Sequence, residues 1–269
     1  MTDRKRIVFF IVYAYLFFWL LLAVAGVLIG TGVISGDGLP MQIGVIIGSW
    51  TPTLALLALR KKILPGRTLK DFYKDAFKEQ LDWKMLTLIA FIQLFIVFCA
   101  SGITAFTKEV SWSGMFDFSF GTLVFGFIYT LLQGATGEES GWRGFLQPSL
   151  EKKFSTVKSS VLVGVIWSFW HTPLWFMSGF SGMELLRYII MFIVSNISVA
   201  IIIGICLKRC SNLLIPVWIH FLFNYFLVPF NAELGDFGGI LDIITWMALF
   251  YALTAAGYIL WNRKNSLRR

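Results

Sequence analysis

Charged residues are scarce in this sequence of 269 residues. Only 14% of them are Asp, Glu, Lys or Arg, whereas 57% are hydrophobic, and the mean hydropathy is +0.75. A globular protein in water needs more polar surface than such a composition supplies. The shortage of charge therefore excludes a water-soluble globule and predicts a protein whose surface faces lipid.

Histidine and cysteine are also rare, with two and three residues. Cys99, Cys206 and Cys210 are an odd number in or beside apolar segments, so they predict no disulfide framework. Cys206 and Cys210 have the i, i+4 spacing at which two thiols on a helix can touch a metal ion, but buried apolar cysteine is the commoner case. His171 and His220 both lie inside apolar runs, which makes them candidates for function.

Long apolar runs are what the sequence has in abundance. They extend over about 17 to 25 residues, the length with which an α-helix crosses a bilayer, and they lack the alternation of barrel strands. The expected fold class is all-α, a polytopic bundle of transmembrane helices. Eight spans are expected, at residues 7–30, 41–59, 85–102, 119–136, 159–176, 185–206, 213–229 and 238–261.

The basic residues indicate the topology. With both termini in the cytoplasm, all of the 23 Lys and Arg residues except Lys108 and Arg187 fall in cytoplasmic segments, as the positive-inside rule requires, so the number of spans is even. Because they are spread over every second loop, the net charge of +8 does not predict nucleic-acid binding. An integral plasma-membrane protein is expected, and its compact form without appended domains is typical of bacteria.

The longest cytoplasmic loop, residues 60–84, has two interpretations. Phe72, Phe77, Trp83 and the lysines among them predict an amphipathic helix lying on anionic lipid headgroups. A solvated connecting loop fits the same residues.

Ionisable side chains follow the fourth apolar run. Charge at bilayer depth costs about 2.5 to 3.5 kcal/mol per residue, so such groups are functional candidates. On a helix Glu139 and Arg143 are i, i+4 and can pair, while Glu138 points about 100° away and is left free to act as a base. The alternative is a solvated helix end.

The fifth to seventh runs carry the remaining buried polar groups. Two residues after His171, Pro173 is expected to kink the helix and open a cavity that admits water. His220 and Asn224 are i, i+4, so they share a helix face, either as donors to an oxyanion or as interhelical hydrogen bonds. Asn196 is assigned to helix packing. Taken together, these residues favour a hydrolytic site.

Three motifs occur on successive apolar segments: Glu138-Glu139-x-x-x-Arg143, Trp167-x-x-x-His171 and His220-x-x-x-Asn224. In type and order they resemble the CPBP family of intramembrane proteases, which includes CAAX prenyl endopeptidases and Abi-like bacteriocin-immunity proteins. The resemblance covers roughly residues 120–230. Where this sequence has Trp167, the family pattern usually has Phe.

The resemblance implies an intramembrane endopeptidase acting on a membrane-associated or lipidated peptide or protein substrate. It implies that Glu138 and His171 activate a water molecule and that His220 and Asn224 stabilise the oxyanion. Glu139 and Arg143 would hold the helix end.

The expected organisation is one membrane domain with three parts. They are N-terminal helices and a cytoplasmic loop at residues 1–115, a protease-like catalytic core at 116–230 and a C-terminal helix at 231–269.

Three alternatives accompany this interpretation. A zinc-dependent protease would use Glu138, His171 and His220 as ligands, but the sequence has no His-Glu-x-x-His motif and a metal-independent glutamate mechanism is favoured. A non-catalytic immunity or regulatory scaffold would have no need of those three side chains. A proton-coupled transporter predicts inverted repeats, whereas all the polar candidates follow residue 130.

Overall fold

The structure is a computed structural model that describes residues 1–36, 38–231 and 239–266. Its elements confirm the all-α fold class, and the turn labelled η2 is a π-helix. In chain order they are α1 (Asp3–Gly30), α2 (Leu39–Ser49), α3 (Thr51–Ile63), α4 (Leu69–Ala76), α5 (Trp83–Lys108), η1 (Ser113–Met115), α6 (Phe120–Leu132), α7 (Ala135–Gly141), η2 (Trp142–Leu146), α8 (Gln147–Glu151), α9 (Thr156–Trp170), α10 (Thr172–Phe176), α11 (Gly182–Arg209), α12 (Leu214–Tyr225) and α13 (Gly239–Ser266).

The eight predicted spans all fall on apolar helices, but not all of these are long. Within the described residues, five helical segments are long and apolar enough to cross a membrane, and α2 with α3, bent by 44°, forms a sixth. The remaining two predictions fall on α9 and α12, which are shorter apolar helices. Residues 232–238, expected to connect the last two spans, lie outside the described part of the chain.

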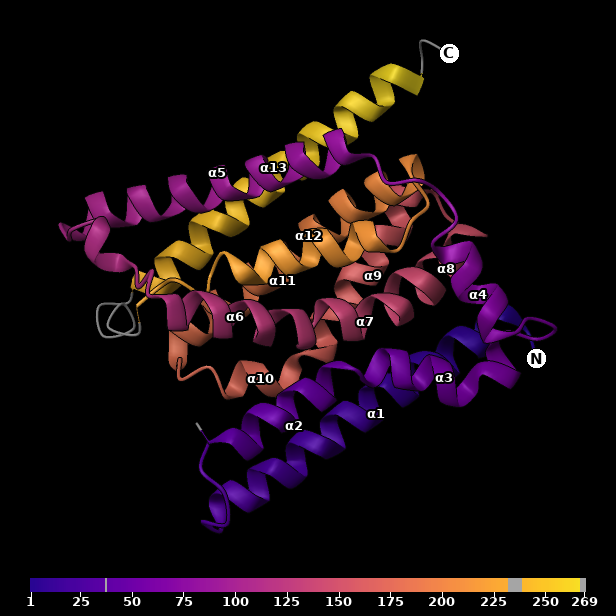
Figure 1. Cartoon of the computed structure of the whole chain (residues 1–269), viewed down its shortest axis with the longest axis horizontal. Helices are drawn as coiled ribbons and strands as arrows, with labels where there is room; N and C mark the ends of the chain where they lie inside the picture. Colours follow the sequence, from indigo (N-terminus) through magenta and orange to yellow (C-terminus); the bar gives the residue numbers. More distant parts are fainter. Residues whose placement is uncertain (37, 232–238, 267–269) are drawn as a thin grey trace.

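The helices are arranged in layers around α7, as Figure 1 shows. The α1–α3 segment runs along one side, α5 and α13 run along the opposite side, and α6, α7, α9, α11 and α12 lie between them. Helix α11 packs against α9 and α13, and α3 packs against α1 and α7. Helix α1 begins and α13 ends at the same end of the bundle (Figure 1), which is what an even number of crossings requires.

The bend between α2 and α3 touches α7 directly. A Cβ atom on Gly137 would lie 2.7 Å from the Trp50 ring, and one on Gly141 would lie 2.7 Å from backbone atoms of Pro52. The Trp50 indole also donates a hydrogen bond of 2.9 Å to the carbonyl oxygen of Leu132, at the end of α6. Only residues without side chains allow this approach, and it fixes the position of α7 in the bundle.

The loop at 60–84, predicted to be cytoplasmic, does form an amphipathic helix, α4, which begins with a capping box. Its apolar side packs on the protein: Phe72 is buried, and the Tyr73 hydroxyl lies 3.3 Å from that of Ser140 in α7. Phe77 and Trp83 are exposed. Helix α4 therefore packs against α7, while the two exposed aromatic side chains lie at its C-terminus (Phe77) and at the start of α5 (Trp83).

Candidate active site

The three charged residues of the first motif lie inside the protein. Glu138, Glu139 and Arg143 each have at most 1% of their surface exposed, so the alternative of a solvated helix end is wrong. The chain enters α7 through Gly134, and after Gly141 it widens into the π-helix η2. Such π-helical turns occur frequently at functional sites.

The predicted pair between Glu139 and Arg143 is confirmed, with 3.0 Å between Oε1 and the guanidinium. The same Oε1 lies 2.7 Å from Nδ1 of His220, a contact that the sequence did not predict. The Arg143 guanidinium also lies 4.5 Å above the Trp167 ring. Glu139 therefore connects α7 to α12 in addition to holding its own helix end.

The sequence analysis expected Glu138 to be free of partners, and this expectation is wrong. Its Oε2 accepts hydrogen bonds from the indole N–H groups of Trp142, at 3.1 Å, and Trp167, at 2.5 Å. Its Oε1 makes no hydrogen bond to any residue that the structure describes. One carboxylate oxygen is thus held in place while the other remains available. Trp142 was missed, although its i, i+4 spacing from Glu138 would have indicated the contact.

The helix break predicted at Pro173 is confirmed. Helix α9 ends at Trp170, His171 caps it, and Pro173 lies in the first turn of α10. His171 Nδ1 lies 2.8 Å from the carbonyl oxygen of Trp167, so a neutral imidazole donates there and keeps Nε2 as an acceptor. The Trp167 ring lies between the histidines, with centroids 5.9 Å from His171 and 4.8 Å from His220.

His220 and Asn224 meet Glu138 beside Gly134. A Cβ atom on Gly134 would lie 3.2 Å from Asn224 Nδ2, 3.4 Å from His220 Nε2 and 3.6 Å from Glu138 Oε1. Polar atoms from α7 and α12 therefore converge on one small space. Because Nδ1 of His220 faces Glu139, only its Nε2 faces that space.

The residues of the zinc alternative can be compared with the described part of the structure. Among the described residues, no group of three or more His, Cys, Asp or Glu side chains is placed to hold a metal ion, and Glu138, His171 and His220 form none. Cys206 and Cys210 are free thiols, and Sγ of Cys210 donates to a backbone carbonyl. Asn196 is buried in α11, a helix that carries none of Glu138, His171 and His220.

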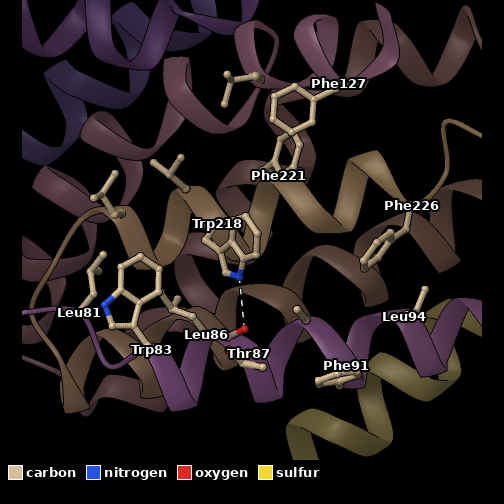
Figure 2. Close-up of a pocket in the computed structure, with 14 residues that line it drawn as sticks. Leu81, Trp83, Leu86, Thr87, Phe91, Leu94, Phe127, Trp218, Phe221 and Phe226 are labelled. Carbon is tan, nitrogen blue, oxygen red and sulfur yellow. Dashed lines mark hydrogen bonds between the residues drawn. The ribbon is translucent and has the colours of Figure 1, made fainter. Parts of the chain in front are cut away.

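The neighbouring face of α12 lines an apolar groove of about 570 Å³, which the sequence analysis missed. Trp218 and Phe221 form one wall, α6 contributes Phe127, and α5 contributes Trp83 and Phe91 (Figure 2). The Trp218 indole donates to a backbone carbonyl of α5. None of the predicted site residues lines this groove, so α12 separates a polar site from a hydrocarbon-like surface.

A buried carboxylate, two histidines and an amide inside a polytopic helical bundle are the groups expected in the class of membrane-embedded hydrolases. Residues 120–226 match the family described as type II CAAX prenyl endopeptidase Rce1-like. The CAAX prenyl protease 2 of Methanococcus maripaludis is 30% identical over 206 residues, which cover 72% of this chain and 73% of that protein. The chain belongs to this protease family, and the predicted resemblance is confirmed.

The Trp167 indole offers a conservative test of how Glu138 is held. Trp167→Phe keeps a ring beside Arg143 and His220 but removes the N–H that binds Oε2. A hydrogen bond to a charged group contributes about 1.5 kcal/mol or more, and the Trp142 bond remains, so kcat is expected to fall about tenfold.

The matched control is Trp175→Phe. Trp175 is as buried as Trp167, but its indole nitrogen has no hydrogen-bond partner among the described residues. Steady-state cleavage rates should therefore separate the two variants. Equal rates for both would show that the indole bond to Glu138 is not used.

Proposed function

We propose that this protein is an intramembrane endopeptidase that hydrolyses a peptide bond of membrane-associated or lipidated proteins with a water molecule activated by Glu138 and His171. The observation that carries this proposal is the buried Glu138 carboxylate. Its Oε2 is fixed by two indoles, and its Oε1 lies beside Gly134, as do His220 Nε2 and Asn224 Nδ2. A preorganised base beside hydrogen-bonding groups is what water-dependent acyl transfer needs.

In the proposed reaction, the oxygen of water attacks the carbonyl carbon of the substrate. A carbon–oxygen bond forms, one water proton passes to the Glu138 carboxylate, and the carbonyl π electrons move onto the carbonyl oxygen. When the carbon–nitrogen bond then breaks, Glu138 returns the proton to the leaving nitrogen. Protons and electrons balance without an oxidant or reductant.

The other side chains have distinct tasks in this proposal. His171, whose Nε2 is an acceptor, accepts a hydrogen bond from the attacking water and so orients it while Glu138 takes the proton. Asn224 Nδ2 donates to the oxyanion, and so does His220 Nε2 in the doubly protonated ring, whose Nδ1 donates to Glu139. Arg143 balances the charge of Glu139, so that Glu138 remains the reacting carboxylate.

Two observations support the proposal that the substrate is lipidated: the similarity to CAAX prenyl protease 2 and the apolar groove beside α12. The relative's name denotes a protease of prenylated CAAX proteins. The groove in Figure 2 is almost entirely apolar and suits a hydrocarbon chain rather than a polar peptide. The predicted topology places the neighbouring loops on the cytoplasmic side, where lipidated chain ends lie.

Chelation tests the proposed metal-independent mechanism. Purified protein in lipid vesicles is expected to cleave a lipidated peptide at an unchanged rate after incubation with a zinc chelator, because proton transfer to Glu138 needs no metal. The products are identified by mass spectrometry. Loss of cleavage on chelation, followed by recovery on addition of zinc, would overturn the glutamate mechanism in favour of the zinc alternative.

A further inference from the structure

Helix α1 bonds to α9 at the point where α9 breaks before His171. In a continuous helix the amide N–H of Leu174 would bond to the carbonyl oxygen of Trp170, but here it bonds to that of His171, at 2.8 Å. The carbonyl oxygen of Trp170 instead accepts a hydrogen bond of 2.9 Å from the Trp19 indole of α1. The open end of α9 is therefore closed by a side chain from another helix.

The contact between α1 and α9 is reciprocal and largely buried. The indole N–H of Trp170 donates at 3.2 Å to the carbonyl oxygen of Ala14, and the Trp170 ring stacks on Phe18 with centroids 4.0 Å apart. All three of these residues are buried. One turn earlier in α9, the carbonyl oxygen of Ile166 accepts a hydrogen bond from the Tyr15 hydroxyl. Both helices thus donate and accept across this contact, which fixes the position of the end of α9.

The orientation of the His171 ring depends on this end of α9. Trp170 directly precedes His171 in the chain, and the two rings pack edge to face with centroids 4.6 Å apart. Nδ1 of His171 lies 2.8 Å from the carbonyl oxygen of Trp167, in the last turn of α9. Phe192 of α11 also packs on the imidazole, with centroids 5.1 Å apart. A shift of the helix end would therefore move the imidazole and change the direction in which Nε2 points.

We propose that α1 positions His171 for the reaction, with Trp19 as the positioning residue that closes the end of α9 and Tyr15 as a second one. This inference rests on the proposed function, in which Nε2 of His171 orients the attacking water, and it adds the part of the protein that aims Nε2. Both residues lie outside residues 120–226, which match the family. Each bonds to a residue 151 positions away in the sequence, so no local pattern indicates either contact.

The variant Trp19→Phe removes the indole N–H and keeps an aromatic ring beside Tyr15. Its kcat for a lipidated peptide is expected to fall about fivefold, because the end of α9 loses one of the hydrogen bonds that hold it. KM should stay within about twofold, since the bond acts on the reacting step and not on substrate binding. Both constants are measured with the protein in lipid vesicles.

Trp112→Phe is the matched control. Trp112 is 41% exposed, against 39% for Trp19, and its indole donates a hydrogen bond of the same length, 2.9 Å, to the Ser101 hydroxyl. Because Trp112 precedes η1 and bonds to α5, this variant should lose a similar bond and keep the wild-type kcat. Equal kcat values for Trp19→Phe and Trp112→Phe would overturn the proposal.

Tyr15→Phe is a second variant that acts on the same end of α9. It keeps the ring and removes only the hydroxyl that bonds to the carbonyl oxygen of Ile166. Its kcat is expected to fall about threefold with an unchanged KM, because a neighbouring bond to α9 is lost. If Trp19→Phe did not fold, a wild-type kcat in Tyr15→Phe would overturn the proposal.

¹⁵N NMR of the histidine rings in lipid vesicles tests the positioning without any activity. The chain has only two histidines, so two sets of ring signals are expected, and His171→Gln assigns them. In the wild-type protein the proton of the neutral His171 ring is expected on Nδ1, which faces the carbonyl oxygen of Trp167. Trp19→Phe should shift the His171 signals toward the other tautomer and leave those of His220 unchanged. Identical His171 signals in the two proteins would overturn the proposal.

The NMR measurement also separates this inference from the proposed function. If the His171 signals depended on Trp19 in a protein that cleaves no peptide, the protease would be contradicted and the positioning by α1 would stand. If an active protease showed His171 signals independent of Trp19, the positioning by α1 would be contradicted and the protease would stand.

Discussion

Replacing Glu138 with glutamine is expected to lower kcat about 1,000-fold, the middle of the range that general-base catalysis contributes. The amide is isosteric and still accepts hydrogen bonds at one oxygen from Trp142 and Trp167, so the fold and the position of the side chain should be kept. What is lost is the ability to take a proton from water. Steady-state cleavage of a lipidated peptide, followed by mass spectrometry, gives the rate.

The control for this variant is Glu184→Gln. Glu184 is an exposed carboxylate in the first turn of α11 and lies outside the polar site. It should leave both kcat and the melting temperature unchanged. Wild-type activity in Glu138→Gln would remove Glu138 from the mechanism, and the proposed function would lose its central residue.

Replacing Arg143 with leucine is expected to lower the free energy of unfolding by about 3 to 5 kcal/mol, because the Glu139 carboxylate would remain buried without its cation. Both side chains of this pair are fully buried. The His220 ring still donates to Oε1, but one hydrogen bond does not replace the guanidinium. Denaturant unfolding in detergent micelles measures the change.

Two further variants identify the cause of this loss. In the double variant Glu139→Gln with Arg143→Leu neither charge remains, so it should recover most of the lost stability, while its amide oxygen still accepts from His220. Arg187→Leu breaks the ion pair with Asp242, in which the arginine is 42% exposed, and should cost no more than about 1 kcal/mol. If Arg143→Leu and Arg187→Leu lowered the free energy of unfolding equally, the buried ion pair would be no more stabilising than the exposed one.

The length of apolar runs predicted most of the fold. Every expected span falls on an apolar helix, because lipid leaves the backbone few other ways to satisfy its hydrogen bonds. Length alone could not show that α9 and α12 are short or that α2 and α3 bend at Trp50. These features depend on packing between helices, which cannot be inferred from the lengths of apolar runs.

Contacts within one helix were predictable, and contacts between helices were not. The pair of Glu139 and Arg143 follows from i, i+4 spacing, and so would the bond from Trp142 to Glu138. Glu139 and His220 are separated by 81 residues in sequence, so nothing local connects them. The space beside Gly134 depends on a positive φ and on the approach of a second helix.

The most direct test of the protease is cleavage of one peptide sequence, with and without a C-terminal lipid, by the protein in vesicles made with ¹⁸O-water. Wild-type protein is expected to cleave the lipidated peptide at a single bond and to place ¹⁸O in the new carboxyl group, whereas Glu138→Gln should not. If correctly folded wild-type protein cleaved neither peptide, or cleaved them as fast as Glu138→Gln does, the account of a glutamate-dependent intramembrane protease would be contradicted.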